Sequence, residues 1–118
     1  MKRFFFVGLM LIFLLLAGQV LAQGGLSTGS YVMKDGTMQV TMDISALSGG
    51  KYFINANGSG GGKNCRIGDL GELRGGSLVL GVCEMGIRIS GDGFDLQDSK
   101  GCAQCDAGAY VSGRYVKK

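Results

Sequence analysis

The four cysteines are the residues of this chain whose chemistry is easiest to interpret from the sequence. Cys102 and Cys105 are separated by two residues, whereas Cys65 and Cys83 stand alone. A zinc site usually needs two closely spaced pairs of ligands, and a thioredoxin-type redox centre needs its cysteines at the start of a helix. The chain has one close pair, in GCAQC, and no helical pattern surrounds it. The sequence therefore favours structural disulfides over a metal site or a redox centre.

Two patterns of disulfide pairing fit the strands expected around these cysteines. A hairpin formed by NCRIG and SLVLGVC, with its turn near Arg74, would place Cys65 opposite Cys83 at a separation that a bridge tolerates. Cys102 and Cys105 would then bond to each other. In the alternative, crossed pattern, Cys65 and Cys83 each bond to one member of the close pair. We expect the first pattern.

The acidic segment SGDGFDLQD, residues 90–98, is a second candidate for chemistry. It is close to one turn of the calcium-binding nonapeptide repeat, and Asp92, Asp95 and Asp98 could attract a cation. Such turns bind calcium when several copies are stacked, and this chain has one copy. We therefore interpret the segment as the tip of a hairpin. We predict no metal site and no cofactor, while weak cation binding by the three aspartates stays open.

The inventory of side chains disfavours an enzyme. The chain has no histidine, so it cannot form a Ser-His-Asp or Cys-His arrangement. Its nine acidic residues are scattered, and no spacing indicates a pair of catalytic carboxylates. We predict no catalytic residues, and the sequence favours a binding or structural protein.

The N-terminal segment has the pattern of a secretory signal. Two basic residues precede the apolar run FFFVGLMLIFLLLAG, and the small residues Val20 and Ala22 fit the site at which a signal peptidase cuts. The apolar run is too short to cross a bilayer comfortably, since about 20 residues are needed. We expect a cleaved signal over residues 1–22 and a single periplasmic or secreted β-domain, without a membrane span, over residues 23–118.

The charge of the exported part gives no support for a nucleic-acid partner. The signal carries two of the twelve basic side chains and none of the nine acids. The exported part therefore contains ten basic and nine acidic side chains, with no block of like charge.

The exported part alternates between apolar and polar residues, as half-buried antiparallel strands do. In MQVTMDI, which begins at Met38, every second residue is apolar. Asp35-Gly36 predicts a two-residue hairpin turn that places Met33 opposite Met38.

Further strands are expected downstream. GIRIS and FDLQ flank the turn signal GDG, so Ile87 and Ile89 should share a face with Phe94 and Leu96. Short strands with turn signals between them, and no amphipathic helix, predict an all-β fold. We expect a small antiparallel β-sandwich or β-barrel that is stapled by disulfides. Pairing of the first and last strands would close a barrel and remove its exposed edges.

The segment SGGKY, which begins at Ser48, resembles the Ser-Gly-x-x-Tyr loop of the small periplasmic inhibitors of c-type lysozyme. Those inhibitors are disulfide-containing β-barrels, in which a loop serine and a lysine of a second motif, Lys-Gly-x-x-Ala, reach into the lysozyme cleft. Only the first motif is present here, because Lys63 is followed by asparagine. The resemblance implies that Ser48, Lys51 and Tyr52 bind a partner.

The sequence thus predicts an exported, non-enzymatic binding or envelope-associated structural module. Its partner would be a protein or a component of the cell envelope. The alternative is a lysozyme inhibitor that inserts the Ser48–Tyr52 loop into the enzyme cleft.

Overall fold

The structure is a computed structural model that describes residues 25–118, so the expected signal over residues 1–22 and its cleavage site lie outside the described residues. The described chain is almost entirely strand: β1 (Gly29–Asp35), β2 (Met38–Ala46), the 3-10 turn η1 (Ser48–Gly50), β3 (Lys51–Gly60), β4 (Lys63–Arg74), β5 (Ser77–Leu80), β6 (Cys83–Ser90), β7 (Gly93–Gln97), β8 (Gln104–Cys105) and β9 (Gly113–Lys117). The all-β prediction is confirmed. No helix in this part of the chain has the length and apolar character needed to cross a membrane.

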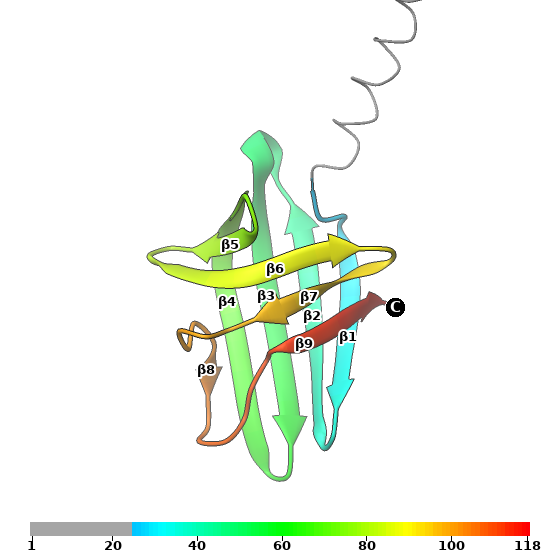
Figure 1. Ribbon diagram of the computed structural model, residues 1–118, viewed down its shortest axis with the longest axis vertical. Coiled ribbons are helices and arrows are strands. Elements are labelled where there is room, and N and C mark those ends of the chain that lie inside the picture. The colour runs from blue at the N-terminus through cyan, green and yellow to red at the C-terminus, as the bar shows by residue number, and fades with distance from the viewer. Residues whose placement is uncertain (1–24) are drawn as a thin grey trace, which may run out of the picture.

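Eight of the strands form a closed antiparallel barrel. Strands β1 to β7 follow one another in chain order, and β9 pairs with both β7 and β1. The expected pairing of the first and last strands is therefore confirmed, with Val32 opposite Val116. In Figure 1 strands β1 to β4 form one layer, and β5, β6, β7 and β9 run across it. The short strand β8 lies outside the ring and pairs with β4.

Apolar side chains from every strand of the ring fill the barrel. The alternation in the sequence points them inward, as in β3, where every second residue from Tyr52 to Gly58 is buried. The remaining core comes from the other strands and from the segments that flank them: Leu26, Tyr31, Met33, Met38, Val40, Met42, Ile44, Cys65, Ile67, Leu78, Leu80, Met85, Ile87, Phe94, Leu96, Ala103, Val111 and Tyr115.

Three aromatic rings pack at the seam where the barrel closes. Phe94 of β7 stacks on Tyr115 of β9, with ring centroids 5.0 Å apart, and lies 5.1 Å from the ring of Tyr31 of β1. Such pairs contribute about 0.5–1.5 kcal/mol beyond the area that they bury. The buried hydroxyl of Tyr115 donates a hydrogen bond to the carbonyl oxygen of Val111 at 2.7 Å, so its desolvation is compensated.

The hairpin of β1 and β2 has its turn one residue later than we predicted. Asp35 pairs with Met38, so Gly36 and Thr37 form the turn and Met33 lies opposite Val40. Gly36 has a φ of 60°, and placing glycine first in the turn spares Asp35 a left-handed conformation. The register differs by two residues, which keeps every side chain on its expected face.

The segment SLVLGVC forms two strands instead of the one that we predicted. β5 ends at Leu80, Gly81 and Val82 reverse the chain, and Cys83 begins β6 opposite Leu80. Gly81 has a φ of 61°, which suits the first position of a tight turn. Because of this second reversal, Cys83 cannot lie opposite Cys65. The β6–β7 hairpin does have the predicted faces, with Ile87 and Ile89 of β6 opposite Leu96 and Phe94 of β7.

The predicted disulfide pairing is consequently wrong, and the crossed pattern is correct. Cys65 bonds to Cys105 and Cys83 bonds to Cys102, with Cα separations of 4.0 and 5.8 Å. The first bridge joins directly opposite residues of β4 and β8. All four cysteines are bonded, as the staple interpretation requires.

Replacement of Gly93 should destabilise the barrel strongly. A methyl group at this position would overlap the carbonyl oxygen of Tyr115 on the neighbouring strand β9. We expect Gly93→Ala to lower the free energy of unfolding by about 3 kcal/mol, because rigid backbone must move. Gly76→Ala is the matched control, since no heavy atom lies within 4 Å of its added methyl group. Denaturant unfolding measures both variants, and equal stabilities would contradict the close packing of β7 against β9.

Peptide mapping without reduction tests the crossed disulfides. Trypsin separates Cys65 from Cys83 and leaves Cys102 and Cys105 together on one peptide. The crossed pattern should join all three peptides, and fragmentation within GCAQC should assign Cys105 to the Cys65 peptide. A direct link between the Cys65 and Cys83 peptides would contradict the structure.

Candidate functional site

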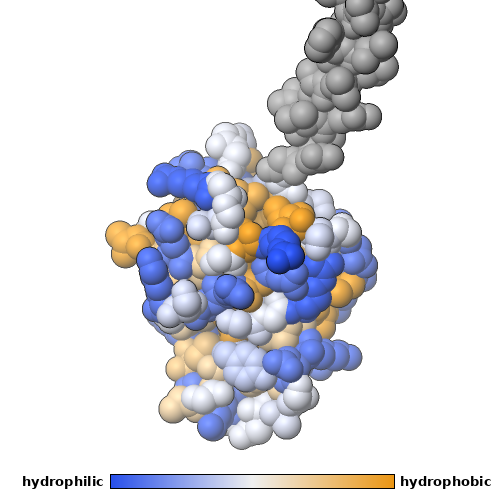
Figure 2. Space-filling view, in the orientation of Figure 1, coloured by the Kyte–Doolittle hydropathy of each residue, from blue (hydrophilic) through white to orange (hydrophobic). Residues whose placement is uncertain are grey.

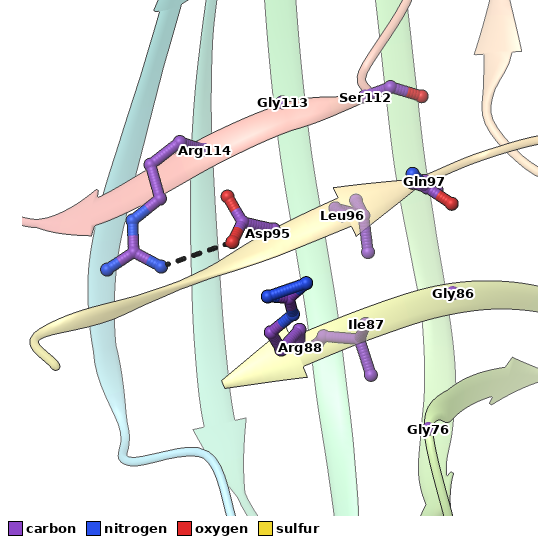
Figure 3. A pocket seen from close by; sticks show the side chains of 10 residues that line it. All are labelled: Gly76, Gly86, Ile87, Arg88, Asp95, Leu96, Gln97, Ser112, Gly113 and Arg114. Carbon is purple, nitrogen blue, oxygen red and sulfur yellow. Dashed lines mark ion pairs between the residues drawn. The ribbon is translucent and has the colours of Figure 1, made fainter. Parts of the chain in front are cut away.

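A groove of about 600 Å³ runs along the outer wall of the barrel over β6, β7 and β9. Figure 3 shows the ten residues that line it, and Figure 2 shows hydrophilic residues mixed with smaller apolar patches on this side of the molecule. The lining consists of glycines, two inward-pointing apolar residues and a set of polar side chains: Gly76, Gly86, Ile87, Arg88, Asp95, Leu96, Gln97, Ser112, Gly113 and Arg114.

Strand alternation and register together build the groove. The residues that alternate with the buried core positions point outward, and the pairing of three strands aligns Arg88, Asp95 and Arg114 in one row. The row crosses β6, β7 and β9 in Figure 3. Beside this row, Gly86 of β6 has no side chain on the outer wall, so the groove is deeper there. The result is a shallow channel with charged groups along one part of it.

The two arginines of the groove differ in their surroundings. Arg114 donates hydrogen bonds to the side-chain and carbonyl oxygens of Ser90, at 2.9 and 2.7 Å, and lies within 4 Å of Asp92 and Asp95. Arg88 is exposed, and within residues 25–118 it forms no ion pair. A guanidinium group in this position can bind a carboxylate or phosphate through two parallel hydrogen bonds.

The three aspartates of the 90–98 segment are all engaged in structural contacts. Asp92 and Asp95 face the guanidinium group of Arg114. Asp98 accepts hydrogen bonds from the backbone N–H groups of Cys102 and Ala103, at 2.6 and 3.0 Å, and so orders the loop that carries one disulfide. In the described part of the chain, no cluster of three or more potential metal ligands occurs.

The other carboxylates are engaged in similar structural contacts. The hydrogen bond that Asp35 accepts from Tyr110 raises the pKa of this phenol. Glu72 lies within 4 Å of a lysine and an arginine, and further carboxylates accept hydrogen bonds from hydroxyl or backbone N–H donors: Asp43 from Ser30, Asp69 from Leu70 and Asp106 from Asn64. Eight of the nine Asp and Glu residues in the sequence thus form ion pairs or hydrogen bonds within the structure.

The residues predicted from the Ser-Gly-x-x-Tyr resemblance lie together at one end of β3. Ser48 is in the exposed turn η1, and Lys51 is exposed at the first position of β3, with its amino group 4.0 Å from Glu72. Tyr52 is buried, and its hydroxyl accepts a hydrogen bond from the N–H of Leu26 at 3.2 Å. Tyr52 therefore fixes the turn to the core of the barrel, while Ser48 and Lys51 are accessible. Their binding role stays a prediction.

Lys63 lies at the other end of β3 from this loop, at the turn of the β3–β4 hairpin. It pairs with Gly60, the last residue of β3, whereas the loop of Ser48 precedes the first residue of the same strand. The separation agrees with leaving Lys63 out of the loop's proposed surface.

Sequence reasoning missed the two arginines of the groove. Arg88 follows the period-two pattern of its strand and carries no motif, so it reads as an ordinary exposed residue. Arg114 enters the row because β9 pairs with β7, although fifteen residues, which include strand β8, separate the two strands in the chain. The opposite charges of Arg88 and Asp95, on the two strands of the β6–β7 hairpin, are the one local signal that points to this site.

Comparisons with models of protein families, with curated protein sequences and with solved structures found no match to this chain. The two disulfides fit a protein outside the reducing cytosol.

Proposed function

We propose that this protein is a binding module that acts in the periplasm or outside the cell, and that it has no catalytic activity. The signal pattern of residues 1–22 and the two disulfides support export. The lack of histidine, and the use of the carboxylates in ion pairs and backbone hydrogen bonds, support binding over catalysis.

The groove over β6, β7 and β9 carries the proposal. Apolar side chains fill the barrel interior, so a ligand is better accommodated on the outer wall. The groove combines a low glycine floor with the exposed guanidinium group of Arg88 and the polar side chains of Gln97 and Ser112. These features suit an extended ligand that carries carboxylates, such as an acidic polymer of the cell envelope.

Removal of the Arg88 charge should weaken binding of such a ligand. With polyglutamate as the probe, we expect Arg88→Gln to raise the dissociation constant about three- to tenfold, because one charge-assisted hydrogen-bonded pair is lost. Binding of the wild-type protein should also weaken as salt is added. Calorimetry or fluorescence anisotropy measures both effects.

Lys34→Gln is the control for this experiment, since it removes the same charge from an exposed site on β1. Equal affinities of the two variants would mean that the groove does not select the ligand. No binding by the wild-type protein would reject a carboxylate-bearing partner.

A second candidate function is inhibition of c-type lysozyme. It is supported by the exposure of Ser48 and Lys51 on a turn that the buried Tyr52 anchors, and by the barrel architecture that the family resemblance implies. The loop projects from the end of the β2–β3 hairpin, where it is free to enter a cleft.

An assay of cell-wall hydrolysis by c-type lysozyme tests this candidate. The wild-type protein should slow hydrolysis, and Ser48→Ala or Lys51→Ala should weaken the inhibition about tenfold with little change in stability, because both side chains are exposed. Lys100→Ala, in an exposed loop elsewhere, should inhibit like the wild type. Hydrolysis at an unchanged rate with excess wild-type protein would reject the inhibitor function and leave the groove proposal intact.

A further inference from the structure

Strand β4 is longer than the two strands that pair with its outer edge. On one side residues 63–72 pair with β3. On the other side β8 covers residues 65–66 and β5 covers residues 71–74. Residues 67–70 therefore have a neighbouring strand on one side only. We call this gap in the barrel wall the β4 notch.

The backbone of the β4 notch presents hydrogen-bonding groups without strand partners. The carbonyl oxygen of Asn64 accepts a bond from Asp106 beside β8, so Asn64 turns its backbone groups to the outer edge. Because this direction alternates along a strand, Gly68 and Leu70 turn the same way. The N–H of Leu70 is bonded to the Asp69 carboxylate at 2.7 Å. In the described chain, the N–H and C=O of Gly68 have no strand partner on this side.

The β4 notch opens into a hollow of about 370 Å³ on the outside of the barrel. Leu80 and Cys83 bound it on the β5–β6 side, and Cys102 and Gln104 bound it on the β8 side. The Cys83–Cys102 bridge ties the two sides together, and the second disulfide fixes β8 to β4. The notch is thus held in one shape before any ligand arrives, which lowers the entropic cost of binding.

The boundaries of the β4 notch favour the end of a chain over a continuous strand. A strand that passed through along β4 would meet β5 at one end and β8 at the other. One or two terminal residues of an extended peptide can enter from the exposed side, where Gly68 has no side chain to obstruct them.

Arg66 selects between the two ends of a peptide. It is exposed at the rim of the notch and, within residues 25–118, forms no ion pair. A guanidinium group there complements a terminal carboxylate, and the backbone of Gly68 complements the adjoining peptide group. We infer that the β4 notch binds the C-terminal end of a partner peptide as a short added strand.

This site shares no residue with the groove over β6, β7 and β9, so the two proposals stand or fall separately. The probe is N-acetyl-Ala-Ala-Ala with a free carboxylate, titrated into the disulfide-bonded protein and followed by amide NMR. We expect the largest shifts at the amides of Gly68, Leu70 and Gln104. The C-terminal amide of the same peptide should bind at least about tenfold more weakly, because the charge-assisted bond to Arg66 is lost.

Three variants sharpen the test. Arg66→Gln should weaken binding of the free-carboxylate peptide about tenfold, whereas Arg88→Gln in the groove should leave it unchanged. Gly68→Leu should abolish the shifts at Leu70 and Gln104 while the protein stays folded, because no heavy atom lies within 4 Å of an added Cβ.

Three results would overturn the inference. The first is the absence of shifts at Gly68 with the peptide at about 10 mM, the weakest affinity that a specific site of this kind should have. The second is an equal response to acetate, which would reduce the site to adventitious anion binding at Arg66. The third is unchanged peptide binding by a folded Gly68→Leu protein.

Discussion

The fold depends on closure of the ring where β9 inserts between β1 and β7. β1 and β9 share only two opposed residue pairs, so backbone hydrogen bonds alone join them weakly. The packed rings of Tyr31, Phe94 and Tyr115 come from all three strands and bury the seam. Without this packing, β1 and β7 would present open edges to other chains. Gly93 permits the contact by letting β7 approach β9 without a side chain between them.

Closure imposes a detour on the chain between β7 and β9, and the disulfides stabilise this detour. The segment leaves the ring after Gln97, forms β8 against β4 and returns at Gly113. Bridges with sequence separations of 40 and 19 residues tie it to β4 and β6. In the chain-entropy estimate they contribute about 4 and 3 kcal/mol. A small core benefits from such cross-links, and the shortness of β8 leaves the notch beside β4.

Apolar side chains fill the interior of this barrel, so the binding sites that we propose lie on its outside. The outward residues of each strand are released from core packing and can vary in polarity, so the walls can carry binding groups without loss of stability. Arg88 and Arg66 are exposed on different walls and have no ion pair in the described chain, while Arg114 is held by Ser90 and two carboxylates. The turn of Ser48 adds a third surface at the end of the barrel.

The sequence by itself determined most of the strands and their faces, because alternation and glycine turns are local properties of the chain. The register of β1 with β2 was predicted two residues away from its true value, yet the buried face was right. The turn at Gly81 and Val82 was not predicted, because valine continues an apolar run. For this reason the predicted partner of Cys83 was wrong. The disulfide partners, the groove and the notch were decided only by tertiary structure. Each arises from a pairing of distant strands, β4 with β8 or β7 with β9, whose register no local pattern specifies.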